Sequence, residues 1–350
     1  MDKDVQPRHK QRGCLWWAGR LLLGFAALLV IVLMITLVAG AKARSDLKAK
    51  YPPPGVLVDI GGYRLHLFCE GTGSPTVVME SGSGDSSLDW ELIRPEITQI
   101  TRTCVYDRAG LGWSDLSPRP RTAESIMEEL HTLLTDAAIA GPYVLVGHSI
   151  GGAYVRLYAH RYPQDVAGMV LVDSSHEEQS LRFPAAYVEF SKKFAQQQIS
   201  QLDFYKFFVA MGVAALDPSL VPASDKLPLA TRETYQALFA DPKVLETIIA
   251  ETKAAESNLA QVGAARITTL GNIPLVVLSA GRHDLPPGAN ISSEVLQQVE
   301  QVWQQLQIEL TRLSPQGKQV LVPQSGHFIQ LEQPQLVIDA IDQVVNEVRK

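Results

Sequence analysis

Short apolar segments recur along the chain after residue 54 and alternate with longer segments of helical periodicity. Segments of roughly four to eight residues that are apolar throughout are typical of strands buried on both faces of a parallel sheet. Helices between such strands cover the two faces, so the pattern predicts an α/β fold. The predicted strands are 56–60, 63–70, 76–80, 101–106, 143–147, 166–173, 273–280 and 318–323, and the predicted helices are 122–138, 150–161, 292–313 and 334–348.

Residues 174–271 interrupt this alternation, because they carry helical periodicity and no strand pattern. We predict that they form a helical cap inserted between two parts of one core, residues 55–173 and 272–350. The aromatic stretch DFYKFFVAMG (203–212) lies within the predicted cap. It is expected to pack inside the cap, with the lining of an acyl pocket as the alternative.

Residues 21–41 read LLLGFAALLVIVLMITLVAGA and contain no charge. At 1.5 Å per residue, such a helix is about 30 Å long, which matches the hydrocarbon core of a bilayer. Trp16 and Trp17 precede the segment, where interfacial aromatic residues are expected. We therefore predict an uncleaved transmembrane helix between an N-terminal tail (1–20) and a proline-containing linker (42–54). A cleaved signal peptide and a buried core helix are the alternatives, although a signal peptide's apolar region is usually only about 7–15 residues long.

The charges on either side of this segment bear on its orientation. Cytoplasmic flanks carry more Lys and Arg than external ones. Lys3, Arg8, Lys10, Arg12 and Arg20 precede the segment, and Lys42, Arg44, Lys48 and Lys50 follow it. The excess of one residue favours a single-pass membrane protein with a cytoplasmic N-terminus and an extracytoplasmic main domain.

Composition narrows the possible partners. The formal net charge of −6 gives no basic footprint for nucleic acid, so no nucleic-acid partner is predicted. The three cysteines form neither a disulfide framework nor a zinc-binding pattern, and no metal or other cofactor is predicted. Cys14 lies beside the apolar segment and could be acylated, although an unmodified thiol is the simpler expectation.

The clearest chemical signal is GHSIG, residues 147–151, between a predicted strand and a predicted helix. In a G-x-S-x-G elbow the serine lies on a strained turn, so its neighbours two positions away must be small. The turn lifts the serine hydroxyl clear of the sheet, at a helix N-terminus that favours developing negative charge. We predict Ser149 as a nucleophile; the alternative is an ordinary strand–helix turn.

A serine hydroxyl needs a base, and a histidine late in the chain is expected to supply it. His327 follows the last predicted strand in PQSGHFIQLEQP, and we predict it as the base. The remaining histidines fit less well. His66 lies on a predicted strand, His131 and His160 on predicted helices, His148 inside the elbow, and His176 and His283 in loops at strand ends.

Two carboxylates could orient His327. Asp284 follows the strand 273–280 after a short loop, which can carry its carboxylate to the Nδ1 side of the imidazole. Asp173 ends the strand 166–173 and is the alternative; its simpler role is a strand-end carboxylate bonded to loop amides. We predict Asp284 as the third member.

Taken together, these residues resemble the α/β-hydrolase family. The resemblance rests on the order Ser149, Asp284, His327, and on the motifs GHSIGG, YDRAGLGWSD and SGHFIQLEQP. It covers about residues 56–348. It implies an eight-stranded sheet whose second strand is antiparallel, no cofactor, and a cap after the sixth strand, which matches residues 174–271.

The resemblance also implies an oxyanion hole. One backbone N–H follows the nucleophile and belongs to Ile150. The other comes from the loop after the third strand, where many members carry His-Gly and this chain has ESGSG (80–84). We assign the second donor to Ser83, with Gly82 as the alternative, because this loop lacks the histidine that marks the position in many members.

Two further expectations follow from the same resemblance. Strands two and four lie side by side in the family, so Cys69 and Cys104 could face each other as a disulfide or as two buried thiols. In the loop DRAGLGWSD, Asp107 and Arg108 are expected to form a structural ion pair. The alternative is that Asp107 and Arg108, together with Trp113, border the substrate site.

The resulting expectation is a membrane-anchored serine hydrolase acting on a small acyl substrate, and an uncharged ester or a lipid-like molecule is the predicted substrate. A small-peptide or amide hydrolase similar to prolyl aminopeptidases is the alternative enzyme. A non-catalytic binding module on the same fold is the alternative of a different class, although such modules typically lose a catalytic residue and all three positions are filled here.

Overall fold

The computed structural model describes residues 11–286 and 288–350. Its centre is an eight-stranded sheet in the order β1-β2-β4-β3-β5-β6-β7-β8. The second strand runs antiparallel to both neighbours and all other pairs are parallel, which confirms the predicted sheet. The strands are β1 (Val56–Asp59), β2 (Arg64–Glu70), β3 (Thr76–Glu80), β4 (Thr103–Tyr106), β5 (Tyr143–His148), β6 (Val166–Val172), β7 (Leu275–Ala280) and β8 (Gly317–Val322).

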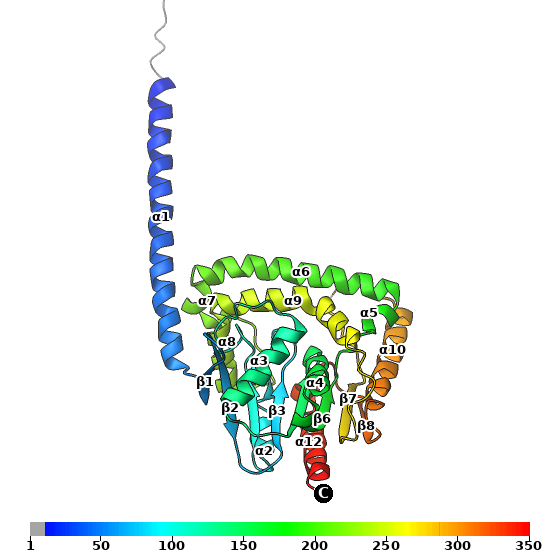
Figure 1. Cartoon of the computed structure of the whole chain (residues 1–350). Helices are drawn as coiled ribbons and strands as arrows, with labels where there is room; N and C mark the ends of the chain where they lie inside the picture. Colours follow the sequence, from blue (N-terminus) through cyan, green and yellow to red (C-terminus); the bar gives the residue numbers. More distant parts are fainter. Residues whose placement is uncertain (1–10, 287) are drawn as a thin grey trace, which may run out of the picture.

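Helices cover both faces of the sheet (Figure 1). In β5, Tyr143 and Leu145 pack on the side of α3 and α4, whereas Val144 and Val146 pack on the side of α2 and α12. A strand buried on both faces explains why this segment is apolar at every position. The core helices are α2 (Arg94–Ile97), α3 (Ala123–Asp136), α4 (Ile150–Arg161), α10 (Ser293–Thr311), α11 (Ile329–Glu332) and α12 (Pro334–Val348), with the short 3₁₀ helices η1 (Ser87–Trp90) and η2 (Pro163–Asp165).

The segment between β6 and β7 is helical and lies over one end of the sheet (Figure 1). Its outermost element, α6, runs along α9, which lies between α6 and the core. The segment contains α5 (Gln179–Arg182), α6 (Ala185–Ala210), α7 (Val213–Leu216), η3 (Pro218–Leu220), α8 (Leu229–Phe239) and α9 (Pro242–Ala264). We call residues 174–271 the cap.

The aromatic stretch of the cap differs from its prediction. Phe204 and Phe207 are 63% and 62% exposed, and Tyr205 is exposed as well. None of them lines the cavity at Ser149 within the part of the chain that the structure describes. These side chains therefore neither pack inside the cap nor form an acyl pocket.

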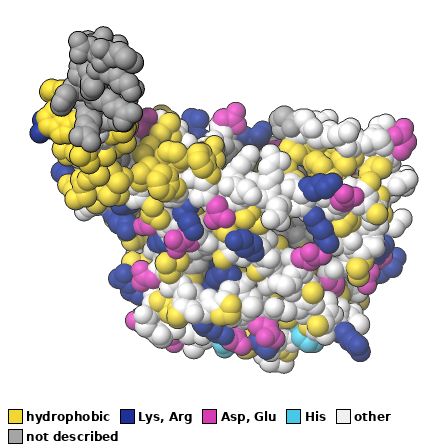
Figure 2. All heavy atoms as spheres, turned by 90° about the horizontal axis from the view of Figure 1, so that it is seen from above, with side chains coloured by type: hydrophobic (Ala, Val, Ile, Leu, Met, Phe, Trp, Pro, Cys, Tyr) yellow, Lys and Arg dark blue, Asp and Glu magenta, His cyan; other side chains and the backbone are white. Residues whose placement is uncertain are grey.

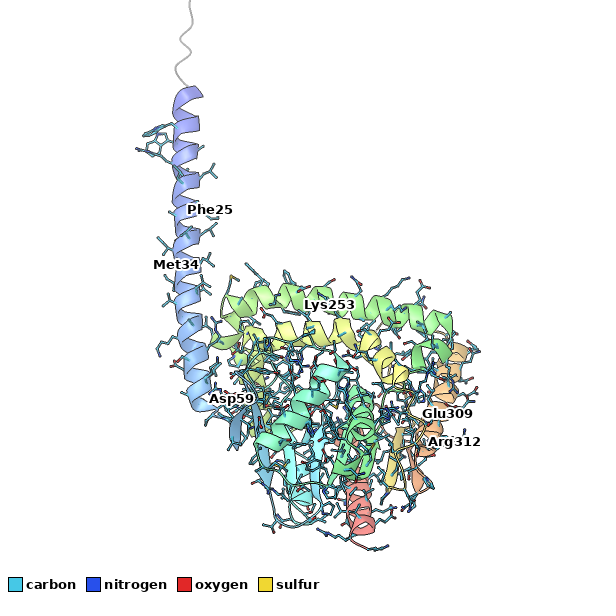
Figure 3. All side chains as sticks on the ribbon, in the orientation of Figure 1. Phe25, Met34, Asp59, Lys253, Glu309 and Arg312 are labelled. Carbon is cyan, nitrogen blue, oxygen red and sulfur yellow. A yellow bond between two sulfur atoms is a disulfide. The ribbon has the colours of Figure 1, made fainter. Side chains whose placement is uncertain are left out.

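The N-terminal helix α1 (Gln11–Lys50) is continuous and projects away from the sheet (Figures 1 and 3). It is long and apolar enough to cross a membrane, and Phe25 and Met34 are exposed on its projecting part (Figure 3). The predicted linker is wrong for residues 42–50, which extend the helix. These residues contain no glycine or proline, and Lys42 pairs with Asp46 one turn later at 2.8 Å.

A disulfide joins Cys69 of β2 to Cys104 of β4. The two residues are direct partners in the antiparallel register of these strands. Of the two possibilities that the resemblance left open, the structure therefore contains the disulfide.

Close packing at the start of α4 gives a test of the fold. A Cβ on Gly152 would lie 2.2 Å from Oγ of Ser174. Alanine favours a helix over glycine by up to about 1 kcal/mol. Overpacking typically costs about 1–3 kcal/mol, so we expect Gly152→Ala to destabilise the protein.

Gly263→Ala is the matched control, because a Cβ there meets its nearest atom at an ordinary 3.4 Å. We expect this variant to be neutral or more stable in chemical unfolding of the detergent-solubilised chain. Equal unfolding free energies for the two variants would contradict the packing argument.

Candidate active site

Ser149 lies on a sharp turn between β5 and α4. Its backbone has φ 56° and ψ −128°, a combination that non-glycine residues rarely adopt. A Cβ on Gly147 would lie 2.6 Å from Cα of Gly152, and one on Gly151 would lie 2.5 Å from the Ser81 carbonyl oxygen. The glycines of the motif are therefore required by the closeness of backbone on either side of the serine.

His327 reaches Ser149 from the loop between β8 and α11. Its Nε2 lies 2.9 Å from Oγ of Ser149. The imidazole is partly exposed on one side, at 43% of its surface. The structure thus brings together the two residues that the sequence predicted as nucleophile and base.

The carboxylate beside His327 belongs to Asp173 and not to Asp284. Oδ2 of Asp173 lies 2.7 Å from Nδ1 of His327. Oδ1 of Asp173 accepts hydrogen bonds from the backbone N–H of Ala280 at 2.9 Å and from Nε1 of Trp303 at 2.8 Å. The carboxylate is 3% exposed and is held by groups from three separate elements.

Asp284 occupies a different environment, so its predicted contact with His327 is wrong. Its carboxylate is 62% exposed and pairs with Arg282 at 3.1 Å. Arg282 also pairs with Glu332 of α11 at 3.2 Å, which keeps this charge group at the surface. After the short loop that follows β7, the side chain therefore binds Arg282 and not the imidazole.

The strand register explains why Asp173 is well placed. His148, the last residue of β5, is paired with Val172, the last residue of β6. Ser149 and Asp173 therefore leave neighbouring parallel strands at the same level. The backbone N–H of Ser149 donates to the Val172 carbonyl oxygen at 3.1 Å, which ties the two turns together.

Electrostatics in the pair follow from burial and charge. Burial acts to lower the pKa of His327, but the hydrogen bond and charge of Asp173, with a further contribution from Asp85, raise it overall. Burial acts to raise the pKa of Asp173, but His327, the Ala280 amide and Trp303 lower it overall. The carboxylate therefore stays ionised beside an imidazole that binds a proton more readily than usual.

His148 and Trp303 support the site, and the sequence analysis did not identify either role. Nε2 of His148 donates to the backbone carbonyl of His327 at 3.1 Å. The pKa of His148 is lowered, mainly by burial and also by the neighbouring His327. Asp85 has the opposite but smaller effect. The elbow motif allows any residue at position 148, so the motif gives no signal for this role. Trp303 is separated from Asp173 by a long stretch of sequence, so no local pattern links them.

The loop after β3 is held by a buried ion network. Arg108 binds Glu80 of β3 and Glu251 of α9, and all three side chains are buried. The predicted pairing of Arg108 with Asp107 is wrong, because Asp107 instead pairs with His66 at 2.8 Å. Arg108 is the cationic partner that both carboxylates share, so its loss would leave the buried Glu80 and Glu251 without it.

Arg108 also binds the backbone of this loop. Its guanidinium donates to the carbonyl oxygens of Ser81 and Gly82, and Glu251 accepts from the N–H of Gly84 at 3.1 Å. Among the described residues, the backbone N–H groups of Ser83 and Ile150 donate no hydrogen bond to a loop, a turn or another element. They are therefore available to bind a group from outside the chain.

A cavity of about 850 Å³ opens above Ser149 and His327, between the core and the cap. Its walls include Phe183, Tyr187, Ile199, Leu259 and Trp303, together with polar residues of α6 and α9. His283 also lines it. The described residues contain no cluster of three His, Cys, Asp or Glu side chains that could hold a metal ion.

The two aspartates can be distinguished by the titration of His327. We expect Asp173→Asn to lower the pKa of His327, because the variant removes the negative charge while burial remains. Asp284→Asn removes an exposed, screened charge and should leave this pKa unchanged. NMR titration, with the resonance assigned through His327→Gln, measures both; the reverse order of effects would contradict the observed geometry.

Comparison with known proteins places the chain in a family. The model of the alpha/beta hydrolase family matches residues 77–340. YqjL of Bacillus subtilis is 28% identical over 272 residues, covering 78% of this chain and 84% of that protein. A protein of Hormonema carpetanum named "Probable transporter efuK" is 36% identical over 142 residues, covering 38% of this chain. The chain spans only 20% of that relative's length.

Solved structures share the fold at low sequence identity. A thermophilic esterase from Thermogutta terrifontis superposes with a TM-score of 0.57 at 21% identity, covering 84% of this chain and 99% of the esterase. The epoxide hydrolase CorEH superposes with a TM-score of 0.59 at 16% identity, covering 84% of this chain and 98% of that chain. The extent of the family match, together with the sheet order and the elbow, shows that this chain is a member of the alpha/beta hydrolase family.

Proposed function

We propose that the chain is a membrane-anchored serine hydrolase that cleaves a carboxylic ester of an uncharged or lipid-like acyl substrate. The observation that carries this proposal is the continuous contact from Oγ of Ser149 through His327 to Asp173. Relatives of the same fold include an esterase and an epoxide hydrolase, so the fold alone does not select the reaction. The choice of acyl transfer rests on the serine at the elbow.

In the first half of the reaction, Ser149 attacks the acyl carbon and His327 accepts the hydroxyl proton at Nε2. The imidazolium that forms is stabilised by the ionised carboxylate of Asp173. Since Asp173 already accepts from Ala280 and Trp303, its position does not change as charge develops on the ring. This fixed arrangement favours the transition state without reorganisation.

The tetrahedral oxyanion would bind the N–H groups of Ile150 and Ser83. Ile150 is the first residue of α4, so its N–H has no acceptor in the helix. The N–H of Ser83 belongs to the same planar peptide as the carbonyl of Gly82, and the two point in opposite directions. Because Arg108 binds that carbonyl, it fixes the direction of the Ser83 N–H. Gly82 remains the alternative donor.

In the second half, His327 returns its proton to the leaving alkoxide, and the ester bond breaks. Water then attacks the acyl-enzyme, with His327 again accepting a proton. His327 returns this proton to Oγ of Ser149 as the acyl–Oγ bond breaks and the carboxylic acid leaves. Each step moves one proton between oxygen and Nε2 and needs no cofactor. The apolar part of the cavity wall is suited to an acyl chain and favours an ester over a charged peptide.

The membrane part of the proposal rests on α1, and the location of the main domain on two observations. One is the small excess of basic residues before the apolar segment. The other is the disulfide between Cys69 and Cys104, since disulfides persist mainly in oxidising compartments. Both favour an extracytoplasmic domain.

A fluorophosphonate probe tests the nucleophile in the detergent-solubilised full chain. We expect labelling of the wild type and none of Ser149→Ala. Asp173→Asn should react about 10³–10⁴-fold more slowly, because its imidazole loses orientation and charge stabilisation. Asp284→Asn should react at the wild-type rate.

Two outcomes would contradict the proposal. A folded wild-type chain that stays unlabelled favours the non-catalytic binding module. Labelling of Ser149→Ala at the wild-type rate would assign the nucleophile to another residue. If labelling succeeds, p-nitrophenyl esters of increasing length and prolyl amides then separate the esterase from the peptidase alternative.

The role of Arg108 can be tested by Arg108→Lys, which keeps the charge and loses the planar fork. Loss of an oxyanion donor typically lowers the rate by a factor of about 10²–10³. We expect kcat of this variant to fall by a factor approaching that range, with KM little changed. Affinity for a trifluoromethyl ketone should fall by a similar factor, because this inhibitor forms the oxyanion.

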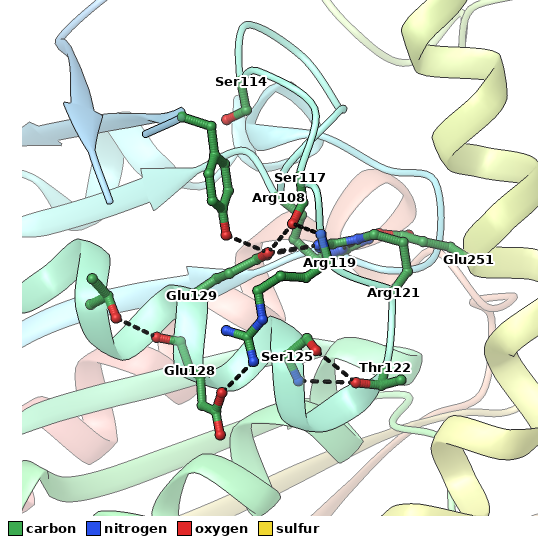
Figure 4. Close-up of polar contacts among 12 residues, drawn as sticks. Arg108, Ser114, Ser117, Arg119, Arg121, Thr122, Ser125, Glu128, Glu129 and Glu251 are labelled. Atoms are coloured by element: carbon green, nitrogen blue, oxygen red, sulfur yellow. Dashed lines mark hydrogen bonds and ion pairs between the residues drawn. The ribbon is translucent and has the colours of Figure 1, made fainter. Parts of the chain in front are cut away.

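Arg121→Lys is the matched control. Arg121 is another buried arginine, paired with Glu129 of α3 at 2.8 Å, and Figure 4 shows this pair near Arg108 and Glu251. Its guanidinium has no contact with the loop after β3 among those the structure describes. An unchanged kcat in folded Arg108→Lys, or an equal loss in both variants, would contradict the positioning role.

A further inference from the structure

The charge-free stretch of α1 that projects free of the cap is shorter than the hydrocarbon core of a bilayer. Every residue from Leu21 to Ile35 is exposed, whereas Thr36 and Ala39 are half-buried and Gly40 is buried. At 1.5 Å per residue, 21–35 spans about 22 Å, against a hydrocarbon core of about 30 Å. The charge-free segment 21–41 matches this thickness only if the hydrocarbon core of the bilayer extends along α1 to residue 41. That level along α1 is already in contact with the cap.

The contact between α1 and the cap is close and fixes their arrangement. A Cβ on Gly40 would lie 2.5 Å from Cα of Gly212, which follows α6. Arg44, one turn further along α1, donates to the carbonyl oxygen of Val209 at 3.0 Å at the end of α6. The end of α6 therefore lies at the level where the apolar segment of α1 ends.

At this end, α6 carries a cluster of aromatic residues that we call the aromatic end of α6: Phe204, Tyr205, Phe207 and Phe208. Neighbouring rings lie 5.0–6.2 Å apart, and three of the four side chains are exposed. In Figure 1, α6 runs along the top of the cap away from α1, and α1 packs against α7, which follows α6. Figure 2, which looks down on this side, shows hydrophobic side chains beside α1.

The remainder of α6 is polar on its exposed surface. Glu189 pairs with Lys193 at 2.7 Å, and Gln196, Gln197 and Ser200 are exposed. Exposed aromatic side chains are thus confined to the end next to α1. An aromatic cluster beside a membrane segment, followed by a polar surface, is the distribution expected of a helix end that enters the membrane interface.

We propose that the aromatic end of α6 inserts into the interface of the bilayer that α1 spans. This inference rests on the membrane anchoring in the proposed function. The bilayer is the occupant because α1 and α6 are held in direct contact, so any membrane around α1 reaches these rings. The cavity above Ser149 lies under the other half of α6, at Tyr187 to Ile199, and is therefore held close to the membrane surface.

Fluorescence of a labelled full chain tests the insertion. In a Cys14→Ser background, Phe207→Cys carries an environment-sensitive nitrobenzoxadiazole group, and Cys69 and Cys104 stay in the disulfide. The matched control is Asn346→Cys, exposed on α12 at the end of the molecule far from α6. Both labelled variants are reconstituted in phosphatidylcholine vesicles, with and without nitroxide-labelled lipid.

We expect blue-shifted emission and at least twofold quenching by the nitroxide lipid at position 207, with neither change at position 346. Aqueous emission at both positions in a protein that resists carbonate extraction would overturn the insertion and leave the anchoring intact. Blue-shifted emission at position 207 that the nitroxide lipid does not quench would indicate a protein partner and would also overturn the insertion. Release by carbonate would overturn the anchoring itself, and the insertion with it.

A second readout uses the double variant Phe204→Ser and Phe207→Ser, which touches neither the cavity nor the triad. We expect hydrolysis of a long-chain ester dissolved in vesicles to fall by about fivefold or more, in line with loss of interfacial contact. Hydrolysis of a short, water-soluble ester should stay unchanged. Equal rates of the variant and the wild type on both substrates would overturn the functional consequence.

Discussion

The carboxylate of Asp173 is the point on which the arrangement of the site depends. It receives hydrogen bonds from β7 through Ala280, from α10 through Trp303 and from the loop after β8 through His327. A buried carboxylate is tolerated only when such partners compensate its desolvation. Because the three donors come from distant parts of the chain, the carboxylate fixes their relative positions, and the imidazole is aimed at Ser149 as a consequence.

A second buried charge connects the cap to the core. Arg108 lies between Glu80 of β3 and Glu251 of α9 and also binds the carbonyl groups of the loop after β3. The cap helix therefore contributes to holding a backbone segment that belongs to the core. Charges in such a network are costly to bury, so its retention is more readily explained by positioning than by stability. The network holds the loop after β3, and Asp173 holds the imidazole beside Ser149.

Much of the architecture could be predicted because it depends on local patterns. Uniformly apolar strands indicated a sheet covered on both faces, and the glycines around Ser149 indicated a tight elbow that the backbone contacts explain. The carboxylate could not be chosen in this way. Asp173 and Asp284 both follow strands between Ser149 and His327, and only the register of β5 with β6 and the path of the loop after β7 separate them. The roles of Trp303 and Arg108 likewise depend on contacts between residues far apart in sequence.

The sequence by itself determined the α/β class, the serine and histidine that meet at the elbow, and the apolar segment at the N-terminus, because each is encoded in neighbouring residues and their periodicity. Only the tertiary structure decided which aspartate faces His327, which carboxylates bind Arg108, and that α1 continues to Lys50 against the cap. The aromatic residues of α6 illustrate the difference. Their apolar character was evident from the sequence, but whether they face a core, a cavity or the surroundings depends on what packs against the helix.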